Sequence, residues 1–150
     1  MVQKKISKLS NLLFSDKSKP EIKNYYAVII RVNVNDFSSE LYQDSVSKCF
    51  TLIQKYDGDV NQFLSGIILA LWGVPLSFPA DKEKSLRFFE ELQNSGLPLS
   101  AILINDTGLY GTFGNENRLT ITPVSDNILN AIKEVINGNC MCNRVEVSTN

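Results

Sequence analysis

Histidine and cysteine, the side chains most used for nucleophilic and metal chemistry, are absent or scarce in this sequence. There is no histidine, and the only cysteines are Cys49, Cys140 and Cys142. Cys140 and Cys142 could form half of a thiolate metal site. A structural zinc site needs about four such ligands, and the sequence has no second cysteine pair. We therefore expect two loop thiols and no bound metal, and the odd cysteine count favours reduced thiols and a cytoplasmic location.

Amide side chains follow the most strongly predicted strand. Tyr25–Ile30 is a continuous apolar run, which indicates a strand buried on both faces. Alternation then places Arg31, Asn33 and Asn35 on one face. A central strand that becomes polar on one face near its end often opens into a functional site, so this face is a candidate.

The elements around this strand are predicted from hydrophobic spacing and turn residues. The first group is a helix from Ser38 or Ser39 to about Tyr56, a hairpin of Val60–Leu64 and Ile67–Trp72 around Ser65-Gly66, and a helix capped by Asp81 that runs to about Asn94. The second group is strands Leu99–Ile104 and Leu109–Phe113 around a turn at Thr107-Gly108, strand Leu119–Val124, a helix Asn127–Val135 capped by Asp126, and strand Arg144–Ser148. This order predicts an α/β (α+β) fold with a ferredoxin-like mixed β-sheet and helices mainly on one face.

The length and charge of the chain further limit the classes of protein to which it could belong. A chain of 150 residues with 43% hydrophobic residues can bury one sizeable core, and its formal net charge of −1 provides no basic field for nucleic acid. No apolar run is long enough to span a membrane. Residues 1–24 carry six lysines and predict an amphipathic helix with a linker, ahead of a domain at 25–150. Packing of this helix on its own domain is favoured over a dimerisation or membrane-surface role.

Read together, four segments resemble the catalytic domain of class III adenylate and guanylate cyclases. Val28–Ser39 reads VIIRVNVNDFSS, similar to the family's apolar strand followed by Asp-x-x-Gly-Phe-Thr. Gly58–Pro75 reads GDVNQFLSGIILALWGVP, similar to the family's hairpin that ends in Phe-Gly-x-Pro. The other two segments are PLSFPADKEKSLRFFEEL and, after Thr107-Gly108, RLTITPVSDNILNAIK. The resemblance covers about residues 25–148 and implies the cyclase fold.

The resemblance implies chemistry that needs two metal-binding carboxylates, because two divalent ions activate the ribose oxygen and neutralise the phosphates. The corresponding positions here are Asn33 and Gly66. Asparagine is a neutral and poor ligand for Mg²⁺, and glycine has no side chain. Asp36 lies an odd number of residues after Asn33, toward the opposite strand face. Asp57 and Asp59 flank the hairpin, so we expect each of these two acids to be a solvated turn or capping residue.

The other half of the family's composite site differs as well. The positions of its transition-state Asn and Arg hold Leu129 and Lys133, and neither side chain can replace the original. The base-selecting Lys position holds Gln62, and its partner position holds Thr122, as in a common bacterial variant of the family. The resemblance therefore implies a cleft with four candidate nucleotide- or anion-binding residues, but with no catalytic residue and no metal ligand. They are Asn33, Gln62, Thr122 and Lys133.

We expect a catalytically inactive, cyclase-like regulatory domain without a cofactor, which dimerises with a second copy or a cyclase-like partner. Whether its cleft still holds a nucleotide or anion, or only mediates dimerisation, stays open. Two other functions remain as alternatives. One is a divergent cyclase that forms a cyclic nucleotide from ATP or GTP, and the other is an unrelated α/β interaction module. Because the family continues beyond its counterpart of Val145–Ser148, a C-terminal truncation or a fragment is also expected.

Overall fold

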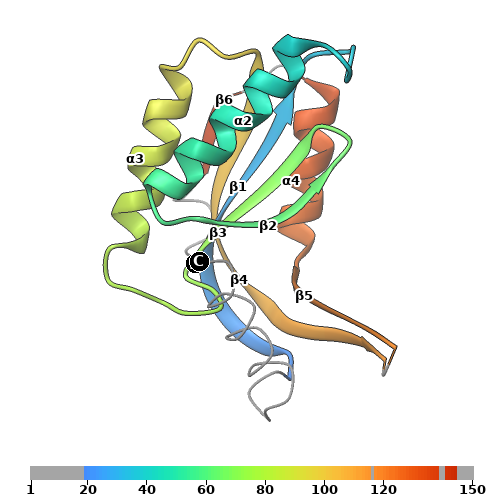
Figure 1. The fold of residues 1–150 in the computed structure, drawn as a ribbon. Helices are drawn as coiled ribbons and strands as arrows, with labels where there is room; N and C mark the ends of the chain where they lie inside the picture. The colour runs from blue at the N-terminus through green and yellow to red at the C-terminus, as the bar shows by residue number, and fades with distance from the viewer. Residues whose placement is uncertain (1–18, 116, 139–140, 145–150) are drawn as a thin grey trace.

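The computed structural model describes residues 19–115, 117–138 and 141–144. Most of the segment predicted at residues 1–24 therefore lies outside the described residues, and so does Cys140. The elements, labelled as in Figure 1, are β1 (Glu21–Val32), α2 (Glu40–Lys55), β2 (Asp59–Leu64), β3 (Ile67–Trp72), α3 (Asp81–Gln93), β4 (Leu99–Asn115), β5 (Arg118–Val124), α4 (Asp126–Asn137) and β6 (Met141–Arg144).

A mixed sheet forms the centre of the fold, as predicted. The strand order is β2-β3-β1-β4-β5, and every neighbouring pair on this path is antiparallel. The last strand, β6, pairs in parallel with β4 along Ala101–Ile104, because the chain crosses over through α4 before it returns to the sheet. The predicted hairpin is confirmed, since β2 and β3 are joined by Ser65-Gly66.

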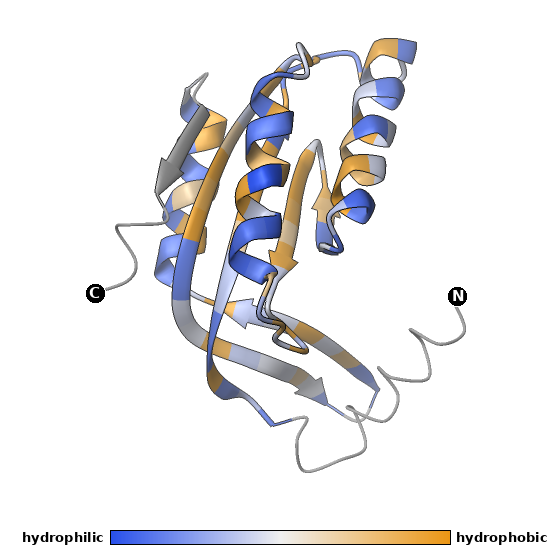
Figure 2. Ribbon diagram, turned by 90° about the vertical axis from the view of Figure 1, so that its left-hand side faces the viewer, coloured by the Kyte–Doolittle hydropathy of each residue, from blue (hydrophilic) through white to orange (hydrophobic). Residues whose placement is uncertain are grey.

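Helices cover both faces of this sheet. Helices α2 and α3 pack on one face, and α4 packs on the other (Figure 2). Strand β1 contributes to both cores, because Val28 and Ile30 point toward α2 and α3 while Ala27 and Ile29 point toward α4. Burial on both faces explains why the Tyr25–Ile30 part of β1 is continuously apolar, as the sequence analysis inferred.

The predicted turn at Thr107-Gly108 is wrong, because β4 runs unbroken from Leu99 to Asn115. Strand β1 begins at Glu21 instead of Tyr25, and its extra residues pair with this part of β4. Asn24 lies opposite Thr107 and donates its amide N–H to the Thr107 hydroxyl oxygen at 2.8 Å. The long pairing thus supplies strand partners to residues whose types suggested a turn.

Two predicted helix caps are also wrong, although the helices themselves are confirmed. The third helix is capped by Ser125, whose hydroxyl accepts from the backbone N–H of Asn127 and of Ile128, and Asp126 is already helical. Asp81 is likewise the first helical residue of α3, and its carboxylate accepts the Phe78 backbone N–H at 2.6 Å. The Ser39 alternative for the first cap is confirmed by its bond from the Tyr42 backbone N–H.

The last strand begins earlier than predicted. The described strand β6 starts at Met141 and not at Arg144, because its register is set by pairing with Ala101–Ile104 of β4. The rest of the predicted segment, residues 145–148, lies outside the described residues. Within the described part of the chain, no helix is long and apolar enough to cross a membrane.

Candidate functional site

The two positions that correspond to metal carboxylates, Asn33 and Gly66, lie next to each other. The backbone N–H of Val32 donates to the carbonyl of Gly66 at 2.9 Å, so the hairpin tip is held against the end of β1. Ser65 and Gly66 have φ values of 51° and 79°. Such left-handed conformations at both central residues make a tight hairpin turn, which favours glycine. The fold therefore brings these two positions together, but the sequence places no carboxylate at either.

Asn33 makes a structural contact to the neighbouring strand. Its amide N–H donates to the hydroxyl of Ser100 at 2.9 Å, and the Ser100 hydroxyl donates to the carbonyl of Gly138 at 3.2 Å. Ser100 is fully buried, and the Asn33 side-chain oxygen is buried without a hydrogen-bond partner. An unpaired buried amide oxygen costs about 1–3 kcal/mol, so this contact is an imperfect one.

The nearby acid, Asp36, is engaged in its own loop. Its carboxylate accepts the backbone N–H of Ser38 at 3.0 Å and the Ser38 hydroxyl at 2.6 Å. These hydrogen bonds lower the pKa of Asp36, because they stabilise the charged carboxylate. Beyond the hairpin, Asp57 has a φ of 61° and pairs with Lys84 at 2.5 Å. The expectation of a solvated turn residue is confirmed for Asp57. It is wrong for Asp59, which is the first residue of β2 and pairs with Leu71 of β3.

Gln62 and Thr122 lie together, although β2 and β5 stand at opposite ends of the strand order. The Gln62 amide N–H donates to the Thr122 hydroxyl oxygen at 3.0 Å. Beside this bond, the Asn61 amide N–H donates to the carbonyl of Ile121 at 3.1 Å. The register of β2 shifts between Val60 and Gln62, so Asn61 is a bulge residue that can reach toward β5. The sheet is therefore curved, and side chains of its edge strands β2 and β5 contact each other.

Leu129 and Lys133 lie one turn apart on the exposed side of α4. Leu129 is 49% exposed, and Ile136, one further turn along, is 47% exposed. The opposite side of the helix buries Ile128, Ala131 and Val135 against the sheet. Neither Leu129 nor Lys133 is drawn into the core with Asn33, so any joint action of the two halves would need a second molecule.

Sequence analysis missed a buried carboxylate, Asp106. It is 2% exposed and accepts from the Tyr25 hydroxyl at 2.9 Å, from the Asn127 amide at 2.8 Å and from the Ser125 hydroxyl. Burial, and then the Asp106 charge, raise the pKa of Tyr25 above its ordinary value, which keeps the hydroxyl protonated as a donor. The cluster lies at the start of α4, where a helix favours negative charge, and it fastens α4 to β1 and β4.

These arrangements limit the chemistry that the site can perform. Among the described residues, no three His, Cys, Asp or Glu side chains come together in a way that could hold a metal ion. Gln62, Thr122 and Asn33 offer amide and hydroxyl groups, which can donate or accept hydrogen bonds from a polar ligand. The buried acid Asp106 accepts hydrogen bonds from three donors and fastens α4 to the sheet.

The sequence itself matches no family model and no curated protein significantly. The structure is similar to solved cyclase structures. The adenylyl cyclase CyaB from P. aeruginosa shares 13% identity and a TM-score of 0.58, over 79% of this chain and 74% of that chain. The guanylate cyclase domain of RhGC from Catenaria anguillulae, solved in complex with GTP, shares 11% identity and a TM-score of 0.59, over 79% and 74%.

A third similar structure is the dimeric guanylyl cyclase domain of the RhoGC fusion protein from the aquatic fungus Blastocladiella emersonii. It shares 12% identity and a TM-score of 0.59, over 79% of this chain and 77% of that chain. A structure without a hairpin at residues 58–73 beside the 25–34 strand would have supported an unrelated α/β module, but the hairpin is present and β3 pairs with β1 over Tyr26–Arg31. On this evidence the chain has the fold of class III adenylyl and guanylyl cyclase catalytic domains.

Proposed function

We propose that this chain is a catalytically inactive cyclase-fold domain that acts by dimerisation, as a regulatory or interaction module of the cytoplasm. The observation that carries the proposal is the contact between Val32 and Gly66, which brings the two metal positions together without a carboxylate at either. Divalent ions that activate a nucleophile and neutralise phosphates need anionic oxygen ligands. An asparagine amide and a bare glycine cannot supply them.

Among the described residues, no neighbouring acid takes over this role. Asp36 is the carboxylate closest in sequence to Asn33, and both its contacts go to Ser38 in its own loop. Moving it toward Asn33 would break two hydrogen bonds next to the Ser39 cap of α2. The missing carboxylates therefore affect both metal positions, and not a single side chain.

Nucleotide binding by the same cleft is disfavoured, though a titration can detect it. The Gln62 amide already donates to Thr122, so a nucleobase would have to replace an existing hydrogen bond. Such an exchange gains little, since the net value of a typical hydrogen bond is about 1 kcal/mol. An emptied cleft that mediates dimerisation is the simpler function for this arrangement.

The exposed face of α4 is the surface proposed for dimerisation. Leu129 and Ile136 are about half exposed, flank Lys133 and lie on the side of α4 away from the core. Full burial of an aliphatic side chain of this size is worth about 1.5–3 kcal/mol. A dimer that covers this face would bury both apolar side chains and leave the Lys133 ammonium at the rim.

Sedimentation velocity on the full chain tests this proposal. The wild type is expected to be dimeric, and Leu129→Glu with Ile136→Glu is expected to shift it to monomer, because two charges would enter the interface. Ile22→Glu is the matched control, since Ile22 is an exposed apolar residue of β1 at 65% exposure and lies on another surface. A wild type that stays monomeric at its highest soluble concentration would contradict the dimerisation proposal.

A further inference from the structure

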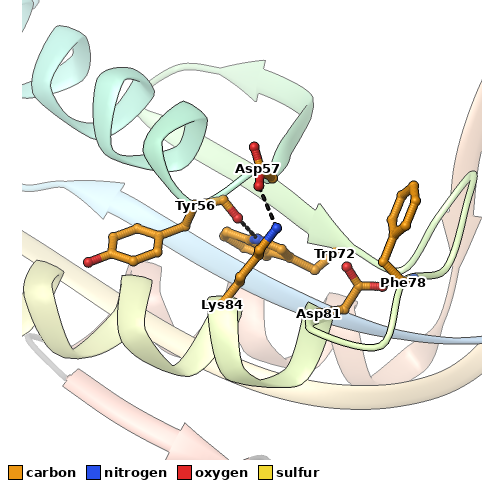
Figure 3. A network of polar contacts seen from close by, with 6 residues as sticks. All are labelled: Tyr56, Asp57, Trp72, Phe78, Asp81 and Lys84. Atoms are coloured by element: carbon orange, nitrogen blue, oxygen red, sulfur yellow. Dashed lines mark hydrogen bonds and ion pairs between the residues drawn. The ribbon is translucent and has the colours of Figure 1, made fainter.

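A pocket of about 500 Å³ lies between the start of β2, the loop after β3 and the β4–β5 hairpin. Its apolar lining includes Trp72, Val74, Leu76, Phe78, Leu119 and Ile121. Leu76 and Phe78 are 52% and 59% exposed, so the rim of the pocket presents large apolar side chains to solvent. A hydrogen bond fixes the Trp72 side chain, because its indole N–H donates to the carbonyl of Tyr56 at 2.8 Å (Figure 3).

The charged side chains of this pocket are all acidic. Asp57, Asp59 and Asp81 line it, and no lysine or arginine is among its described lining residues. Lys84 neutralises one of these acids by pairing with Asp57 at 2.5 Å (Figure 3). Asp59 and Tyr110 both line the pocket, and burial, followed by the charge of Asp59, raises the pKa of Tyr110 to about 12. The described lining of the pocket is therefore apolar, and its charged side chains are carboxylates.

The first described residues of the chain lie beside the Tyr110 side of this pocket. Lys19 and Pro20 pack so closely on Gly111 that a Cβ there would lie 2.6 Å from the Pro20 Cα, and Gly111 directly follows Tyr110. Eighteen residues precede Lys19. At about 3.3 Å per residue when extended, or about 1.5 Å when helical, that length exceeds the span of a pocket of this size.

The composition of these eighteen residues is complementary to the pocket. They carry four lysines and a single acid, Asp16. Their apolar residues at near-helical spacing are Ile6, Leu9, Leu12 and Leu13. A segment of this kind presents an apolar stripe flanked by cationic side chains, which matches an apolar pocket lined by carboxylates.

We propose that residues 1–18 bind to this pocket in the same chain, with Leu9 and Leu12 on its apolar lining and the lysines over its carboxylates. The segment then covers the exposed Leu76 and Phe78 side chains. The proposal is independent of the dimer surface on α4, because the pocket is lined by β2, β3, the loop after β3 and the β4–β5 hairpin. It makes the N-terminal segment part of the domain surface and not a free tail.

Zero-length carbodiimide crosslinking of the full chain tests this placement, with an equal mixture of unlabelled and ¹⁵N-labelled protein read by mass spectrometry. The expected result is crosslinks from Lys4, Lys5 or Lys8 to Asp57 or Asp59 within one isotopic form. Mixed-isotope crosslinks at the same sites would overturn the proposal in favour of a second copy as the occupant. Absence of any crosslink from residues 1–18 to the pocket would overturn it as well.

A matched pair of full-length variants separates specific docking from loose proximity. Leu9→Asp with Leu12→Asp is expected to reduce the within-chain crosslinks at least tenfold, because aspartates would enter an apolar and acidic pocket. Ser7→Asp with Ser10→Asp adds the same charge at polar positions and is expected to retain most of the crosslinks. Equal losses in both variants would contradict docking through the leucines. Wild-type binding to phosphatidylserine vesicles that removes the crosslinks would show that a membrane surface is the preferred partner.

Discussion

Two polar clusters lie along strands β1 and β4 and differ in how fully their buried polar atoms are hydrogen-bonded. In one, Asn33 reaches the buried Ser100, and its side-chain oxygen has no partner. In the other, Asp106 accepts hydrogen bonds from three side chains, those of Tyr25, Ser125 and Asn127. The two clusters flank the same stretch of the β1–β4 ladder, since Arg31 pairs with Ser100 and Tyr25 pairs with Asp106.

The difference shows where this fold retains a buried charge. A buried carboxylate is tolerated only when hydrogen bonds and a favourable field compensate for its lost hydration. Asp106 has both, because three donors and the start of α4 surround it. At the Asn33 end there is a neutral amide, and nothing compensates for its unpaired oxygen. One cluster fastens α4 to the sheet, and the other lies at a position that the resemblance to cyclases assigns to a metal ligand.

The largest expected effect comes from removal of the satisfied cluster. Asp106→Ala leaves the Tyr25 and Asn127 donors without their acceptor, and we expect a loss of about 3 kcal/mol in the free energy of unfolding. Urea denaturation followed by circular dichroism measures this loss. Asp106→Asn is the matched control and should lose less, because it keeps one acceptor oxygen. A loss for Asp106→Ala within the error of the wild type would contradict the structural role of the cluster.

A smaller effect is expected from charge restored to the other cluster. Asn33→Asp with Gly66→Asp places two carboxylates at positions that the Val32–Gly66 hydrogen bond holds together. We expect Mn²⁺ affinity to rise at least tenfold over the wild type in isothermal titration, which corresponds to about 1.4 kcal/mol. Asn33→Asp alone is the control and should gain less. If the double variant binds Mn²⁺ no better than the wild type, the two positions do not form a latent metal site.

The smallest effect concerns the contact between the edge strands. Gln62→Ala or Thr122→Ala removes one exposed hydrogen bond, and each should cost about 0.5–1 kcal/mol in the free energy of unfolding. In a double-mutant cycle the two losses should not add, since both changes break the same bond. Fully additive losses would show that Gln62 and Thr122 do not interact in solution.

Much of the fold could be predicted from periodicity and turn chemistry. The hairpin at Ser65-Gly66, the apolar run of β1 and the Ser39 cap all reflect local rules, and the structure confirms them. The predicted caps Asp81 and Asp126 were each wrong by one residue, whereas the errors in the strands came from long-range pairing. Thr107-Gly108 has the composition of a turn, but the extension of β1 to Glu21 keeps these residues within a strand. No local signal marks a partner strand more than eighty residues away.

The candidate site was only partly predictable from the sequence. Sequence alignment with the cyclase family paired Gln62 with Thr122, and the structure brings them to 3.0 Å. Asp106 was missed because an acid after a buried run has the same local pattern as a solvated strand end. Only the tertiary contacts from Tyr25 and Asn127 distinguish it. The binding roles of Asn33, Gln62, Thr122 and Lys133 remain predictions.

The central claim is that a cyclase fold is present without the metal-dependent reaction, and turnover tests it most directly. The full chain is incubated with ATP or GTP and Mn²⁺, and cyclic nucleotide is quantified against a blank without protein. The account predicts no product above the blank with either substrate. Cyclic AMP or cyclic GMP that forms in proportion to the wild-type protein, and that disappears on chelation of the metal, would contradict it.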